Sequence, residues 1–144
     1  MSDLVYDYGL CEECNQENTN YYWCKACNSK HFQQNFEKWT SGNVDIDKFI
    51  QDTQLSANTR YKVLEWIPYD RFYDIEYIAK DGFGKVYKAN WIDGYIFIWD
   101  NKNQNWVRRE SNKFVALKSL NNSKMLNWNL SMKYELIYLM KFLI

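Results

Sequence analysis

Apolar residues change their period along the chain, and the first period to appear is that of a helix. Phe32, Phe36 and Trp39 recur at positions i, i+4 and i+7, a spacing that places three aromatic rings on one helical face. Ser41 and Gly42 follow directly and predict the end of this helix. Aromatic residues at helical spacing most often pack in a core, so we interpret this face as a packing surface.

A second helix is predicted immediately after the first. Asn43 is a favoured N-cap residue, and Ile46, Phe49 and Ile50 recur on one side of the helix that would follow it. The short connection around Gly42 predicts that the two helices form a hairpin, with their apolar faces turned toward a common core.

From residue 74 onward the apolar period shortens to that of β-strands. Residues 74–79 and 85–91 predict two strands of a sheet, which a third strand at 114–118 would complete. Residues 95–99 and 106–109 flank a polar turn and predict an added β-hairpin. The sequence thus predicts an α+β fold, in which a cysteine-rich segment and a helical hairpin precede an antiparallel β-sheet.

The length and the charge limit the number of domains and the kinds of partner. A chain of 144 residues is long enough for one domain, or for a domain with a small module attached. We place a boundary near Asn58, between a cysteine module with its helical hairpin (residues 1–57) and the sheet (residues 58–144). Lys and Arg number 18, as do Asp and Glu, so we expect no nucleic acid and no anionic membrane as main partner. A protein or a small molecule is the expected partner.

The two ends of the chain predict an intracellular location. Residues 1–7 have neither a basic start nor an apolar run, so they do not resemble a secretory signal. The apolar stretch at residues 136–144 is too short for a membrane span, and a lysine interrupts it. We therefore expect a cytoplasmic protein whose cysteines stay reduced.

The four cysteines of the chain are clustered and predict a metal site. Cys11 and Cys14 form one C-x2-C pair, and Cys24 and Cys27 form another. Each pair places two thiolates on one side of a turn, as tetrahedral zinc requires. A pair of disulfides or four inert thiols are the alternatives, which the reducing compartment and the tight pairing disfavour. Because four protein ligands leave no position for a reacting water, we expect a structural zinc ion.

The residues around the cysteines add no further ligand. A lone histidine on an amphipathic helix more often faces solvent, so we do not count His31 as a ligand. Acidic residues slightly outnumber basic ones between residues 11 and 39, which argues against phosphate binding by this segment. We expect Tyr21, Tyr22 and Trp23 to cover the metal site, which is too small to form its own core, rather than to stack on nucleic-acid bases.

Two motifs in the strand region occur in the order typical of a protein kinase small lobe. Residues 78–89 read IAKDGFGKVYKA, and residues 114–118 read FVALK. The first motif resembles the glycine-rich loop that covers nucleotide phosphates, and the second resembles the strand whose lysine reaches the α and β phosphates. From residue 66 to 118 the chain therefore resembles the small lobe of the protein kinase superfamily. With its cysteine motif it resembles fungal kinase-like proteins that carry an N-terminal four-cysteine zinc motif.

This resemblance implies an ATP site on the sheet. Val86 and Ala116 would line the adenine, Lys118 would pair with the phosphates, and Glu135 would hold the lysine in place. The full set of residues that the resemblance implies is Ile78, Phe83, Gly84, Val86, Ala116, Lys118 and Glu135.

The motifs also depart from the kinase pattern. Ala79 and Asp81 occupy the positions of two of the three signature glycines, and Asp81 adds a Cβ and a negative charge where phosphate would approach. The 144 residues contain neither an H-R-D nor a D-F-G motif, so the catalytic aspartate and the magnesium ligand of the family have no counterpart. We expect weak ATP binding, no catalytic residue and no phosphoryl transfer.

Two functional expectations follow from the sequence. The first is a truncated, catalytically incomplete protein kinase-like protein. The second is a non-catalytic zinc-containing module that binds a protein partner and for which nucleotide is irrelevant. Nucleic-acid binding by the cysteine segment is a third hypothesis, which the slightly acidic charge of that segment disfavours.

Overall fold

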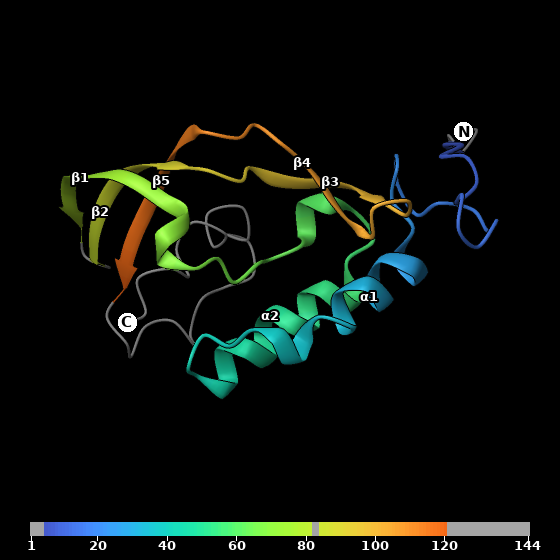
Figure 1. Cartoon of the computed structure of the whole chain (residues 1–144), viewed down its shortest axis with the longest axis horizontal. Coiled ribbons are helices and arrows are strands. Elements are labelled where there is room, and N and C mark those ends of the chain that lie inside the picture. The colour runs from blue at the N-terminus through green and yellow to red at the C-terminus, as the bar shows by residue number, and fades with distance from the viewer. Residues whose placement is uncertain (1–4, 82–83, 121–144) are drawn as a thin grey trace.

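The computed structural model describes residues 5–81 and 84–120, which form helices and two antiparallel sheets (Figure 1). The α-helices are α1 (Lys25–Gln33) and α2 (Val44–Ser56), and three short 3-10 turns cover Phe36–Lys38, Arg60–Lys62 and Tyr69–Arg71. The strands are β1 (Phe72–Asp81), β2 (Gly84–Trp91), β3 (Tyr95–Asp100), β4 (Asn105–Arg109) and β5 (Lys113–Leu120). The expected α+β class is confirmed, and in the described ranges no helix is long and apolar enough to cross a membrane.

The first predicted helix begins and ends earlier than its apolar spacing suggested. α1 ends at Gln33, and Phe36 lies in a separate 3-10 turn. The backbone N–H of Gln34 donates to the carbonyl oxygens of both Lys30 and Phe32, which tightens the last turn and ends the helix. Phe32 and Phe36 still pack against the same core. Tertiary packing therefore places these two rings, and a continuous helix does not.

α2 begins where the sequence predicted. The backbone of Asn43 is extended, and its side-chain oxygen accepts hydrogen bonds from the backbone N–H groups of Asp45 and Ile46. The cap thus satisfies two of the four free donors at the helix N-terminus. Ile46 and Ile50 are buried. α1 and α2 lie side by side and form the predicted helical hairpin (Figure 1).

The order of the larger sheet is β1-β2-β5, so the chain leaves it after β2 and returns after the β3–β4 hairpin. The added hairpin predicted from the sequence is confirmed as a separate two-stranded sheet. One face of the larger sheet is buried by a core of Ile67, Phe72, Ala89, Trp91 and Leu117. Leu117 and Ala89 are fully buried, because they lie on neighbouring strands and face the same side.

The β3–β4 hairpin packs against the cysteine-rich segment. The core cluster at this contact comprises Trp23, Phe32, Ala57, Val63 and Ile96, and Trp106 packs against it. The ring of Trp23 stacks with that of Trp106, with centroids 5.9 Å apart. The Nε1–H of Trp23 also donates to the carbonyl oxygen of Ala57 at 3.1 Å. Both sides of the expected domain boundary contribute to this one core, and the division into two domains stays a prediction.

A partly buried ion pair fixes the hairpin to the segment that precedes the sheet. Arg108 on β4 donates to both carboxylate oxygens of Glu65, at 3.1 and 2.6 Å, and to the carbonyl oxygen of Gly94 at 2.9 Å. Burial works to lower the pKa of Arg108, but the charge and hydrogen bonds of Glu65 outweigh it, and the pKa is raised. Arg108 therefore stays charged and belongs to the packing, whereas Arg109 beside it is exposed.

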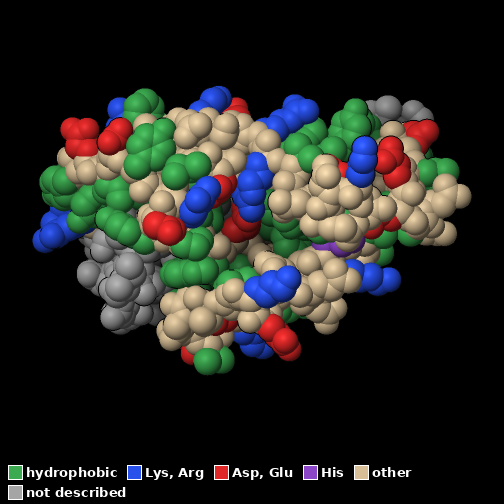
Figure 2. Space-filling view, viewed as in Figure 1, with side chains coloured by type: hydrophobic (Ala, Val, Ile, Leu, Met, Phe, Trp, Pro, Cys, Tyr) green, Lys and Arg blue, Asp and Glu red, His purple; other side chains and the backbone are tan. Residues whose placement is uncertain are grey.

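The surface mixes charges of both signs with exposed aromatic rings. Figure 2 shows Lys and Arg side chains among Asp and Glu side chains over the visible face, as the equal charge counts lead one to expect. Tyr6, Tyr21, Tyr22 and Tyr61 are each more than half exposed, between 53% and 68%. Rings of this kind offer binding surface that the core does not use.

We predict that Gly94, between β2 and β3, does not tolerate a side chain. Its φ is +76°, and a Cβ at this position would lie 2.0 Å from the carbonyl oxygen of Arg109. Because the clash is with backbone, Gly94→Ala should lower the free energy of unfolding by about 2 kcal/mol or more, as measured by urea denaturation.

Gly42→Ala is the matched control for this prediction. Gly42 also has a positive φ, +86°, but a Cβ there would meet no atom within 4 Å. Only the cost of the left-handed conformation, about 1 kcal/mol, is therefore expected. Equal losses in the two variants would show that the close approach of Arg109 does not matter.

Candidate metal centre

The first cysteine pair lies in a tight turn near the N-terminus. The backbone N–H of Cys11 donates to the carbonyl oxygen of Gln16 at 2.7 Å, and that of Asn15 donates to Cys11 O at 2.9 Å. Asn15 has a φ of 59°, a left-handed conformation that asparagine tolerates better than most residues. The turn also places the amide nitrogen of Glu13 3.4 Å from Cys11 Sγ. Cys14 Sγ lies in the same cluster as Cys11 Sγ.

The second cysteine pair lies at the N-terminus of α1. Cys24 is the residue before the helix, and Cys27 lies in its first turn. The carbonyl oxygen of Cys24 accepts a hydrogen bond from the Asn28 N–H at 2.9 Å, which begins the helical ladder. The free N–H groups and the positive end of the helix dipole at this terminus favour the thiolate form of nearby cysteines.

The four sulfur atoms form one compact cluster. Cys11 Sγ and Cys27 Sγ are 3.8 Å apart, Cys14 Sγ and Cys24 Sγ are 3.7 Å apart, and all four lie within 4.8 Å of one another. A tetrahedral zinc ion with Zn–S bonds of about 2.3 Å requires sulfur separations of about 3.8 Å. All four cysteines are free. The expected cluster suited to a metal ion is confirmed, without disulfides.

The thiols of the cluster differ in their pKa. The pKa of Cys14 is lowered, chiefly by a hydrogen bond from the backbone N–H of Gln16. Burial nevertheless raises the pKa of Cys24 and of Cys27, in spite of their position at the helix N-terminus. A bound cation would neutralise the buried thiolates, so metal binding and loss of the thiol protons are coupled at this site.

His31 lies beside the cluster and pairs with an acidic residue. Its Nε2 is 2.9 Å from both carboxylate oxygens of Glu13, and its ring stacks on Trp99 with centroids 3.9 Å apart. Because the side chain is only 11% exposed, the expectation that it faces solvent is wrong. Across the described part of the chain, the group placed to hold a metal consists of the four cysteines, without His31. Trp99 comes from β3, so helical spacing alone could not predict this burial.

The three aromatic residues before Cys24 differ in their environments. Trp23 is 1% exposed and belongs to the core beneath the cysteine segment. Tyr21 and Tyr22 remain 53% and 68% exposed. Trp23 thus supplies the apolar support that the small metal segment lacks, and the two tyrosines leave their rings largely open to solvent.

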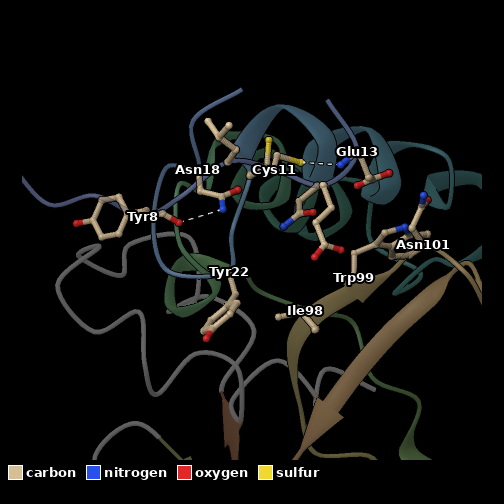
Figure 3. A pocket seen from close by; sticks show the side chains of 12 residues that line it. Tyr8, Cys11, Glu13, Asn18, Tyr22, Ile98, Trp99 and Asn101 are labelled. Atoms are coloured by element: carbon tan, nitrogen blue, oxygen red, sulfur yellow. Dashed lines mark hydrogen bonds between the residues drawn. The ribbon is translucent and has the colours of Figure 1, made fainter. Parts of the chain in front are cut away.

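A cavity of about 290 Å³ opens beside the cysteines (Figure 3). In the figure Cys11 and Asn18 lie on one side of it, and Tyr22 and Ile98 lie on the other. Its walls come from the cysteine segment and from β3 and its turn: Tyr8, Leu10, Cys11, Glu12, Glu13, Asn18, Tyr22, Cys24, Asn28, Ile98, Trp99 and Asn101. The sequence does not predict this cavity, because residues more than 70 positions apart form it and no motif marks them.

The residues implied by the kinase resemblance come together only in part. Val86 on β2 is the register partner of Lys118 on β5, and Gly84 and Ala116 occupy positions on the same face. This face is opposite to the one that buries Leu117. Ala116 is exposed.

The other implied residues do not complete the site. Ile78 lies at an irregularity in the pairing of β1 with β2 and is 55% exposed. Phe83 and Glu135 lie outside the described residues. The nucleotide site therefore stays a prediction that rests on the shared face of β2 and β5.

Comparisons with protein-family models, curated proteins and solved structures gave no match.

We predict that His31 contributes to stability and not to metal binding. His31→Ala should leave the metal content of the purified protein unchanged, because the sulfur cluster does not include the imidazole. The variant should nevertheless melt at a lower temperature, since Trp99 loses its stacking partner and Glu13 loses its hydrogen bonds. Elemental analysis and thermal unfolding measure the two effects. Loss of the metal from folded protein would show that His31 is a ligand after all.

Proposed function

We propose that this chain is a non-catalytic module, stabilised by one structural zinc ion, that acts by binding a protein partner. The observation that carries the proposal is the spacing of the four sulfur atoms, which lie within 4.8 Å of one another and match a tetrahedral zinc site. Cys11, Cys14, Cys24 and Cys27 would hold the ion. Four thiolates complete the coordination shell, so no position remains for a reacting water, and the role is structural.

The position of the cluster supports a structural role. It joins the N-terminal turn to the start of α1, while Trp23 and Phe32 of the same segment pack against β3 and β4. A metal that fixes this segment therefore also fixes the surface to which the hairpin is docked. The free thiols agree with a reducing, intracellular environment, which we include in the proposal.

The surface around the hairpin supports a protein partner. The guanidinium of Arg109 lies 3.6 Å from the centroid of the Phe97 ring, and that of Arg60 lies 4.4 Å from it. Tyr22 contacts the same ring, with centroids 6.0 Å apart. Exposed tyrosine and arginine side chains are enriched where proteins bind one another, and the balanced net charge gives no advantage to nucleic acid.

We predict about one zinc ion per chain in protein purified under reducing conditions, after removal of any affinity tag. Cys24→Ser should abolish zinc binding and unfold the cysteine segment with the β3–β4 hairpin, because both depend on the core around Trp23. The β1-β2-β5 sheet, which has its own core, should keep more of its structure. Elemental analysis and amide hydrogen exchange measure these outcomes.

Ala26→Ser is the matched control for the cysteine substitution. Ala26 lies between Cys24 and Cys27 on the same helix and is exposed, so this variant should keep both the zinc and the fold. Zinc near zero in reduced, folded wild-type protein would overturn the proposal.

A kinase-like nucleotide-binding lobe is the second candidate function. One observation favours it: Val86 on β2 is the register partner of Lys118 on β5, and Val86 and Ala116 lie on the sheet face opposite to the core. The sequence opposes it, because Ala79 and Asp81 replace loop glycines. Loss of charge-assisted phosphate contacts costs about 1.5–3 kcal/mol each, so two or three such losses weaken a micromolar site to about millimolar or worse.

We therefore predict that ATP with magnesium binds with a dissociation constant in the millimolar range or higher, and that no phosphoryl group is transferred. Calorimetric titration should detect no micromolar ATP binding, either in the wild type or in Lys118→Met. Micromolar binding that Lys118→Met abolishes would instead favour the nucleotide-binding lobe over the zinc-stabilised interaction module as the main function.

A further inference from the structure

The cavity beside the cysteines has the polarity of a site for a cation. Within the described part of the chain none of its lining residues is lysine or arginine, whereas Glu12 and Glu13 both line it. Glu13 is already paired with His31. The side chain of Glu12 makes no hydrogen bond or ion pair with any residue that the structure describes.

The metal centre adds to this negative charge. Cys11 and Cys24 belong to the sulfur cluster and also line the cavity. Four thiolates outweigh the charge of one zinc ion, so the whole complex would keep a formal charge of about −2. The cavity therefore lies between an unpaired carboxylate and an anionic centre, and both attract a positive group.

A buried polar side chain at the same place also lacks a partner. Asn28 is only 5% exposed and lines the cavity. Its backbone N–H bonds to Cys24, but its side-chain amide has no hydrogen-bond partner in the described ranges. The amide atoms of Asn28 are not among the fully buried polar atoms of the described residues, so they keep access to the cavity, where a ligand can donate a hydrogen bond to the amide oxygen.

The remaining walls suit the stem of a long side chain. Tyr22, Ile98 and Trp99 supply aromatic and apolar surface, and Figure 3 shows Tyr22 and Ile98 on the side of the cavity opposite to Asn18. The volume of about 290 Å³ is far above the 10–15 Å³ that one water molecule needs. Methylene groups pack well on such walls while a charged head group meets the polar end.

We propose that this cavity binds a cationic side chain, a lysine or an arginine, that a protein partner inserts beside the zinc centre. The inference rests on the proposed zinc-stabilised module and specifies the chemistry of its partner. Glu12 would receive the positive charge, and Asn28 would accept a hydrogen bond through its side-chain oxygen. Tyr22 and Ile98 would contact the aliphatic stem.

The test uses three small probes and the full zinc-loaded chain. Nα-acetyl-lysine methylamide, Nα-acetyl-arginine methylamide and the neutral Nα-acetyl-norleucine methylamide are titrated while the indole N–H signal of Trp99 is followed by NMR. At least one cationic probe should shift this signal with an affinity in the millimolar range, as expected for a single side chain. The norleucine probe should bind at least about fivefold more weakly.

Two variants test whether the carboxylate of Glu12 attracts the cationic probe. Glu12→Gln should weaken binding of the cationic probe about two- to fivefold, which is the usual effect of one partly exposed ion pair. Glu37→Gln removes an exposed carboxylate of the 3-10 turn outside the cavity and should leave the affinity unchanged. Equal effects of the two variants, or equal binding of the norleucine probe, would overturn the inference.

Zinc content measured on the same samples separates the two levels of the proposal. One zinc per chain with no shift of Trp99 by either cationic probe would overturn the cavity inference and leave the zinc-stabilised module standing. Folded protein without zinc would overturn both, because the anionic centre would be missing.

Discussion

The mutual approach of four thiols is the constraint on which the N-terminal half of the structure depends. Two sequence-local turns create it, one closed by hydrogen bonds between Cys11, Asn15 and Gln16, and one formed where α1 begins at Cys24. Four sulfurs within 4.8 Å of one another fix the relative position of these turns. Without a cation the buried thiols would have to stay protonated, since burial raises the pKa of Cys24 and Cys27. A metal makes the same arrangement favourable because it supplies the opposite charge.

Trp23 connects the metal segment to the rest of the molecule. It precedes the second cysteine pair, is 1% exposed, and donates its indole N–H to Ala57 at the end of the helical hairpin. Its ring stacks on Trp106 of β4. One side chain therefore connects the metal segment, the helices and the hairpin, which together form a single core. The hairpin that interrupts the larger sheet thus has a structural role, since it covers the metal segment from outside.

The larger sheet is organised differently, by a buried face and an opposite face that carries the residues of the kinase resemblance. Leu117 and Ala89 face the core, whereas Val86 and Ala116 occupy the other side. The same alternation that buries one set of residues exposes the next, so a shared face is an ordinary result of strand geometry. The sulfur cluster is more informative, because four cysteines from two separate turns converge without strand periodicity to align them.

The sequence by itself determined the elements that local chemistry controls. Strand alternation placed β1, β2 and the hairpin, the side chain of Asn43 capped α2, and cysteine spacing defined the four-sulfur cluster. Each of these features depends on residues only a few positions apart, so the sequence alone is enough to predict it. Only the tertiary structure decided that the side chain of His31 is largely covered by Trp99 and that a cavity opens beside the cysteines. Both depend on β3 and its turn, more than 60 residues away from the segment that they cover, and packing between distant segments has no local pattern that would predict it.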